Sequence, residues 1–217
     1  MPWHPLERSA LVDALTGAGP GRATLCAGWR TEHLAAHVVL RESSFVAAGA
    51  VVPGLADRAE AAIQDLGNRS ASPANYAALV ARLAGGPPRL QPMRIAGDAA
   101  NLLELFVHTE DVRRGEGPAP DRARDPAHAA TLWRQARTMA RLAYRRSPVG
   151  VVLATPLGEA RGARARSAPS GPQGDVVLRG SLDAVVLHAF GRRSAAEVTL
   201  EGDDAAVAAF TAWARRD

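Results

Sequence analysis

Four polar side chains lie on one face of a strongly apolar helix that the sequence predicts over residues 99–114, with Asp98 as its N-cap. They are Asn101, Glu104, His108 and Asp111, and their three- and four-residue spacing places them in one stripe. The rest of this helix is apolar around most of its circumference, which predicts burial. Because an unpaired buried polar group costs about 1–3 kcal/mol, the stripe must find partners. Metal coordination is one solution, since a carboxylate and an imidazole one turn apart can bind the same ion.

A third ligand is expected on a facing helix, because two protein ligands hold a divalent ion weakly. His37 is the best candidate, since it lies on the apolar stripe of a helix predicted over residues 31–49. Three protein ligands with one open position are typical of a catalytic zinc site. On spacing alone the alternatives stay open: His37 also fits a hydrogen-bonded core histidine, and Glu104 with His108 also fits an ion pair on a helix surface.

Three further side chains have relevant chemistry outside this set. His33 lies one turn before His37 and offers an alternative ligand, although we expect it to face the surface. Cys26 precedes the second helix and is expected to be a packing residue and not a nucleophile. Arg192 is a candidate for binding an anionic substrate group, because arginine can bind a carboxylate with two hydrogen bonds. An ordinary surface arginine also fits that position.

Helices are predicted for the first two thirds of the chain, where apolar residues recur at three- and four-residue spacing between Gly, Pro and N-capping residues. Besides the two above, they cover residues 6–16, 55–66, 73–83 and 125–146, with a connection over 85–92. After Pro148 a β-branched run begins, and strands are predicted over residues 149–154, 159–166, 175–179 and 196–200. Helices over 181–190 and 203–215 complete the chain. The expected fold class is α+β, with a four-helix bundle over residues 1–147 and a small α+β domain over 148–217.

Two segments, CAGWRTEHLAAH (residues 26–37) and ELFVHTEDVRR (residues 104–114), give the chain a resemblance to a known family. It resembles the DinB-like superfamily, and within it the branch related to mycothiol-dependent maleylpyruvate isomerase. Shorter similarities at residues 148–153, 188–192 and 198–203 extend the resemblance over almost the whole chain.

The resemblance implies a DinB-like four-helix domain that binds a divalent metal through His37, Glu104 and His108, and the ligand pattern makes zinc the first candidate. It also implies a low-molecular-weight thiol, mycothiol or a similar compound, as cosubstrate, which attacks a small electrophilic substrate in an isomerase or transferase reaction. In such a family Asp111 and Arg41 would support the ligands. Thr109 departs from the family pattern, since close relatives carry histidine there. His33 also departs from it, because histidine is not the usual residue at that position.

The composition excludes several other classes of protein. The isoelectric point near 10.4 suggests a nucleic-acid binder, but the chain contains no lysine, and its net charge is only +4. Because arginine stays charged up to about pH 12, a small surplus of arginine keeps the isoelectric point high. We therefore expect neither nucleic acid nor a membrane as partner. The N-terminus lacks the features of an export signal, and with a single cysteine the chain fits a cytoplasmic protein.

Two other functions remain alternatives at this point. The site also suits a metal-dependent hydrolase, in which a metal-bound water attacks an amide or ester. It equally suits a metal-binding protein without catalytic activity. The ligand types suit zinc, nickel, iron or manganese. The sequence predicts neither the oligomeric state nor the electrophilic substrate.

Overall fold

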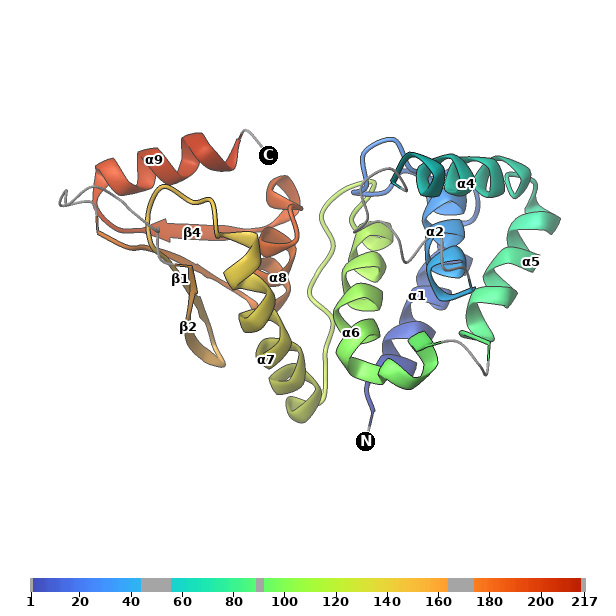
Figure 1. The fold of residues 1–217 in the computed structure, drawn as a ribbon, viewed down its shortest axis with the longest axis horizontal. Helices are drawn as coiled ribbons and strands as arrows, with labels where there is room; N and C mark the ends of the chain where they lie inside the picture. The colour runs from blue at the N-terminus through green and yellow to red at the C-terminus, as the bar shows by residue number, and fades with distance from the viewer. Residues whose placement is uncertain (1, 44–55, 89–91, 164–173, 216–217) are drawn as a thin grey trace. The chain divides into compact units, whose positions relative to one another are not determined.

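The chain forms two compact units, Met1–Ala119 and Pro120–Asp217 (Figure 1). The structure, a computed structural model, describes residues 2–43, 56–88, 92–163 and 174–215. The first unit is built from helices, and the second combines helices with a four-stranded sheet. The predicted α+β class, with a helical N-terminal part and an α+β C-terminal part, is therefore confirmed. Within the described residues, none of the helices has the length and hydropathy of a membrane span.

The N-terminal unit packs its helices around α2, which contacts α1, α4, α5 and α6. The helices are α1 (His4–Ala18), α2 (Thr31–Ser43), α4 (Ala56–Arg69), α5 (Pro73–Ala84) and α6 (Pro92–Arg113). Their shared core is aliphatic and includes Leu11, Leu15, Leu34, Val38 and Leu105, all fully buried. The expected end of the second helix, at residue 49, lies outside the described residues.

The sequence predicts His33 on the surface, but the structure buries it at the N-terminus of α2. The side chain is 7% exposed, and its Nδ1 accepts a hydrogen bond from the Arg30 backbone N–H. This bond satisfies a donor at the start of the helix, as in a capping box. Its Nε2 lies 3.2 Å from Asn68 Oδ1, against Gly67 of α4, where a Cβ atom would lie 2.4 Å from the imidazole. His33 is therefore a core residue that joins α2 to α4.

Asp98 caps a different helix from the one expected. The sequence predicts a helix starting after Asp98, but α6 begins at Pro92 and is kinked at Gly97, whose φ is 52°. The carboxylate of Asp98 accepts hydrogen bonds from the backbone N–H groups of Trp3 and His4, at 2.8–3.0 Å. A negative charge at these free N–H groups stabilises the start of α1. Asp98 therefore fastens α1 to α6.

The C-terminal unit contains α7 (Pro126–Ala143), which the sequence analysis placed with the N-terminal helices by drawing the boundary after residue 147. The structure instead starts this unit at Pro120. The buried face of α7 includes Leu132, Trp133 and Ala136, and the helix packs against β2 and α8. An amphipathic helix signals that one face is buried but not what covers it, so the sequence could not assign α7 to a unit.

The sheet of the C-terminal unit has the strand order β2-β1-β3-β4, with β1 and β3 parallel and the outer pairs antiparallel. The strands are β1 (Val151–Thr155), β2 (Gly158–Ala163), β3 (Val176–Gly180) and β4 (Val198–Glu201). The remaining elements are α8 (Leu182–Ala189), the 3₁₀ turn η2 (Arg193–Ala195) and α9 (Asp204–Ala214). The expected strands are present with small shifts at their ends, and the predicted end of the second, at residue 166, lies outside the described residues.

An aromatic cluster fills the space between α7, α8 and α9. It contains Tyr144, His188, Phe210 and Trp213, with ring centroids 5.6–6.2 Å apart. The Tyr144 hydroxyl lies 2.7 Å from His188 Nδ1. Burial, helped by the charge of Arg193, lowers the pKa of His188 from 6.5 to about 4. His188 is therefore neutral at neutral pH and accepts the hydrogen bond of Tyr144.

Candidate functional site

The structure brings together the three side chains that the sequence analysis chose as ligands. His37 comes from the middle of α2, and Glu104 and His108 from successive turns of α6. Glu104 Oε1 lies 3.1 Å from His37 Nε2 and 3.3 Å from His108 Nε2. One donor atom of each residue lies within 4.8 Å of the other two. The imidazole rings of His37 and His108 meet edge to face, with their centroids 5.0 Å apart.

The cluster is buried at His108 and partly exposed to solvent at His37 and Glu104. His108 is 8% exposed at its side chain, whereas His37 and Glu104 are 21% and 26% exposed. The apolar neighbours of Glu104 and His108 on α6 are buried, Leu105 and Phe106 completely. His37 and Glu104 are therefore the members of the cluster that a small molecule can reach most easily.

The charges in the cluster depend on one another. Burial would raise the pKa of Glu104, but hydrogen bonds from His108 and His37 hold that pKa well below its ordinary value. Burial works to lower the pKa of His108, but its contacts with Asp111, Cys26 and Glu104 raise that pKa well above 6.5. Burial lowers the pKa of His37. The cluster therefore holds an ionised carboxylate beside two imidazoles, of which His37 is the one that favours its neutral, metal-binding form.

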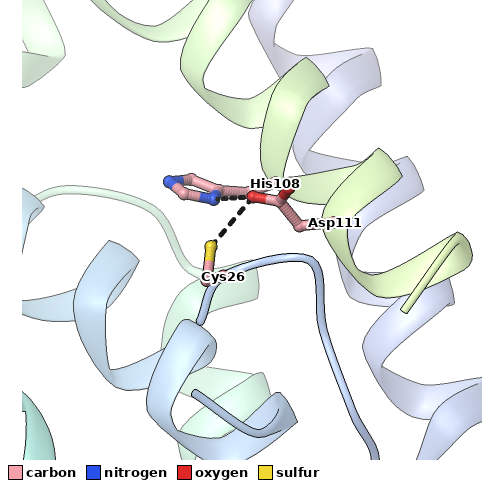
Figure 2. Close-up of side chains that lie close together, drawn as sticks. All are labelled: Cys26, His108 and Asp111. Carbon is pink, nitrogen blue, oxygen red and sulfur yellow. Dashed lines mark hydrogen bonds and ion pairs between the residues drawn. The ribbon is translucent and has the colours of Figure 1, made fainter. Parts of the chain in front are cut away.

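Asp111 orients His108 from behind. Its Oδ2 lies 2.9 Å from His108 Nδ1, and the residue is completely buried (Figure 2). With Nδ1 directed at Asp111, Nε2 is the ring nitrogen that faces Glu104 and His37. A carboxylate behind a histidine ligand fixes the ring and makes it a better donor. This is the supporting position that the family resemblance implied for Asp111.

Arg41 lies at the other end of the polar stripe. Its guanidinium donates to Asn101 Oδ1 at 3.0 Å and to the Ala100 carbonyl at 2.6 Å, while its Nε lies 3.3 Å from Glu104 Oε1. Asn101 also donates to the Gly97 carbonyl. Arg41 thus contacts the carboxylate directly and links it to the kink of α6, as expected for a supporting residue.

The donor set and its spacing fit a divalent metal ion. Bonds of about 2.0–2.1 Å to nitrogen and oxygen place the ligand atoms of a tetrahedral site about 3.3 Å apart. The two distances from Glu104 Oε1 match this value, and two imidazoles with one carboxylate are a common donor set for zinc and related ions. His37, Glu104 and His108 could therefore hold an ion without rearrangement of the helices.

Three residues considered in the sequence analysis lie elsewhere. His33 does not join the cluster, because both of its ring nitrogens are engaged in the core. Thr109, next to a candidate ligand, is fully buried and donates to the Leu105 carbonyl of its own helix. Arg192 belongs to the C-terminal unit, where it donates to the Phe190 carbonyl. Its predicted contact with a substrate anion stays a prediction.

Sequence reasoning missed two residues on the loop between α1 and α2. Cys26, expected to be a packing residue, directs its thiol at Asp111, with Sγ 3.1 Å from Oδ2. Trp29 packs its ring against His37, with centroids 5.0 Å apart, and donates from Nε1 to Glu60 of α4. The only available signal was their closeness in sequence to His37, which does not reveal contacts with α4 and α6.

Residues 7–100 match the family model described as the mycothiol maleylpyruvate isomerase N-terminal domain. This part of the chain is therefore similar to that domain family. The match covers most of α1, all of α2, α4 and α5, and the first part of α6, and so includes His37 but ends before Glu104. The family resemblance drawn from the sequence motifs is thereby confirmed. No curated protein sequence matches the chain significantly.

Two solved structures share the fold over most of the chain. One is mycothiol-dependent maleylpyruvate isomerase, with a TM-score of 0.54 and 21% sequence identity, covering 92% of this chain and 91% of that one. The other is a histidine-to-alanine mutant of mycothiol-dependent maleylpyruvate isomerase, with a TM-score of 0.51, 20% identity and the same coverage. At this level of identity, the likeness concerns the fold alone.

Proposed function

We propose that this protein is a metal- and thiol-dependent isomerase or transferase that acts on a small electrophilic substrate. The observation that carries the proposal is the cluster of His37, Glu104 and His108, whose three donor atoms lie within 4.8 Å of one another, with Glu104 Oε1 at 3.1 Å and 3.3 Å from the two imidazole nitrogens. The family of the N-terminal domain and the fold shared with a mycothiol-dependent isomerase support a thiol as cosubstrate.

The proposed ion, zinc, would lower the pKa of a bound thiol and so keep its sulfur as a thiolate at neutral pH. With the ion bound, His37 and His108 would contribute neutral nitrogen donors, His108 after giving up its Nε2 proton, and Glu104 would contribute one negative charge, which leaves room for an anionic sulfur. Asp111 keeps His108 directed at the site, and Arg41 holds Glu104 on its other side. The nucleophile then comes from the cosubstrate, mycothiol or a similar thiol, and the chain itself provides binding and orientation.

Cobalt offers a direct test, since it occupies zinc sites and reports sulfur ligation by its colour. Addition of mycothiol to the cobalt-loaded protein should produce a saturable sulfur-to-cobalt charge-transfer band in the near ultraviolet. The S-methyl derivative of mycothiol serves as the matched control and should produce no such band, because it has no thiolate. His37→Ala should also show none. A cobalt spectrum that does not respond to the thiol would contradict the proposal and would favour a metal-bound water, as in a hydrolase.

A further inference from the structure

The loop between α1 and α2 is fastened to the end of α6 by two neighbouring contacts with one residue. The backbone N–H of Leu25 donates to the Asp111 carbonyl at 3.0 Å, and the Cys26 thiol donates to Asp111 Oδ2 at 3.1 Å (Figure 2). The loop also lies tightly on the helix end at Gly115, where a Cβ atom would come within 2.1 Å of the Ala23 carbonyl oxygen. The backbone contacts of Ala23 and Leu25, which come just before Cys26, thus hold its thiol at Asp111.

One oxygen of Asp111 serves two side chains. Oδ2 accepts a hydrogen bond from His108 Nδ1–H at 2.9 Å and another from the Cys26 thiol at 3.1 Å. Because Asp111 is fully buried, the direction of its carboxylate is set by protein donors. A carboxylate held in this way fixes the plane of the His108 ring and hence the direction of Nε2, which lies at Glu104.

Cys26, His108 and Asp111 also form a second group of potential metal ligands. Their spacing argues against that role. Tetrahedral zinc, with bonds of about 2.3 Å to sulfur and 2.0–2.2 Å to oxygen, separates the two atoms by about 3.6 Å. The observed separation of 3.1 Å between Sγ and Oδ2 is instead that of a hydrogen bond. Asp111 and His108, at 0% and 6% exposed, also lack the partial exposure that His37 and Glu104 give the first group.

We propose that Cys26 is a positioning residue for the metal centre, whose thiol donates to Asp111 and so holds His108 in its ligating orientation. It is neither a metal ligand nor the nucleophile of the reaction. This inference rests on the proposed metal centre at His37, Glu104 and His108. Without the thiol, the buried carboxylate loses one of its donors, so it holds the His108 ring less firmly.

The test compares Cys26→Ala with Cys26→Ser, with Ala27→Ser as a control at the exposed neighbouring position. Zinc affinity is measured by competition with a chromophoric chelator, in the full chain. Cys26→Ala should bind zinc about tenfold more weakly, at the lower end of the effect of removing such a supporting group. Cys26→Ser keeps a donor and should remain within about twofold of the wild-type protein, as should Ala27→Ser. Thermal unfolding of the metal-free variants shows whether each is folded.

Three results would overturn the inference. The first is equal zinc affinity of Cys26→Ala and the wild-type protein. The second is a loss in Cys26→Ser as large as in Cys26→Ala, and the third is a sulfur-to-cobalt band in the wild-type protein before any thiol is added. Either of the last two results would indicate that the Cys26 sulfur binds the metal. The cobalt spectrum of the wild-type protein decides between ligand and positioning residue even if Cys26→Ala fails to fold. A wild-type protein that binds no divalent ion would instead contradict the metal centre itself, a result seen before any Cys26 variant is made.

Discussion

His108→Ala is expected to weaken the binding of a divalent ion about a thousandfold, so that the purified variant no longer retains it. The substitution removes one of three donors, and it also leaves the buried Asp111 without the imidazole that it contacts. A structural zinc site with four ligands is worth about 10–16 kcal/mol, so the loss of one ligand is worth about 2.5–4 kcal/mol, and the loss of the imidazole contact of Asp111 places His108→Ala at the upper end, near a thousandfold. His37→Ala removes a donor on the facing helix and should have a similar effect.

Elemental analysis of protein purified without a polyhistidine tag measures this directly. The wild-type protein should carry about one divalent ion per chain, as a site with three protein ligands and an open position does. His4→Ala is the matched control, since His4 is a partly exposed histidine bound to Asp98, away from the cluster. It should keep the ion. Full metal content in both His108→Ala and His37→Ala would falsify the site.

The C-terminal unit should lose about 3 kcal/mol of stability between pH 6.5 and pH 4, and His188→Phe should remove most of that loss. The pKa of His188 is about 4 in the folded protein, because the ring is buried, and 6.5 when the chain is unfolded. Between pH 4 and pH 6.5 the unfolded state binds a proton that the folded state does not. The contribution of neutral His188 to the free energy of unfolding is therefore complete above pH 6.5 and is lost as the pH falls toward 4. The difference between the two pKa values corresponds to about 3 kcal/mol.

Urea denaturation at a series of pH values measures the slope of the unfolding free energy. Phenylalanine at position 188 keeps the stacking on Phe210 and cannot titrate, so the slope of His188→Phe should be much flatter. In Tyr144→Phe the hydrogen bond is lost but the imidazole stays buried, so most of the pH dependence should remain. Identical slopes for His188→Phe and the wild-type protein would show that His188 is not the titrating group.

The part of the site that the sequence predicted depends on local periodicity. The spacing places four polar residues on one face of a helix: Asn101, Glu104, His108 and Asp111. Because the residues around them are apolar and predict burial, these polar side chains had to find hydrogen-bond or metal partners. The same argument placed His37 on the buried stripe of its helix. These predictions needed only the geometry of single helices and the cost of burying polar groups.

The parts that the sequence could not predict depend on contacts between distant segments. Asp98 has the sequence context of a cap for α6 but binds the start of α1, 94 residues away. Cys26 contacts a carboxylate 85 residues away, and His33 contacts Asn68. The position of α7 in the C-terminal unit has the same cause. In each case the residue type was compatible with two partners, and only the packing of whole helices selected one.

The most direct test of the central claim is the conversion of maleylpyruvate by the zinc-loaded protein, with and without added mycothiol. Maleylpyruvate is named in the family model that matches residues 7–100 and in the solved structure of similar fold, so it serves as the first electrophile to assay. Isomerisation should require both the thiol and the ion, and should be lost in His37→Ala while His4→Ala retains it. A protein that converts maleylpyruvate equally well without the thiol, or equally well without the ion, would contradict this account.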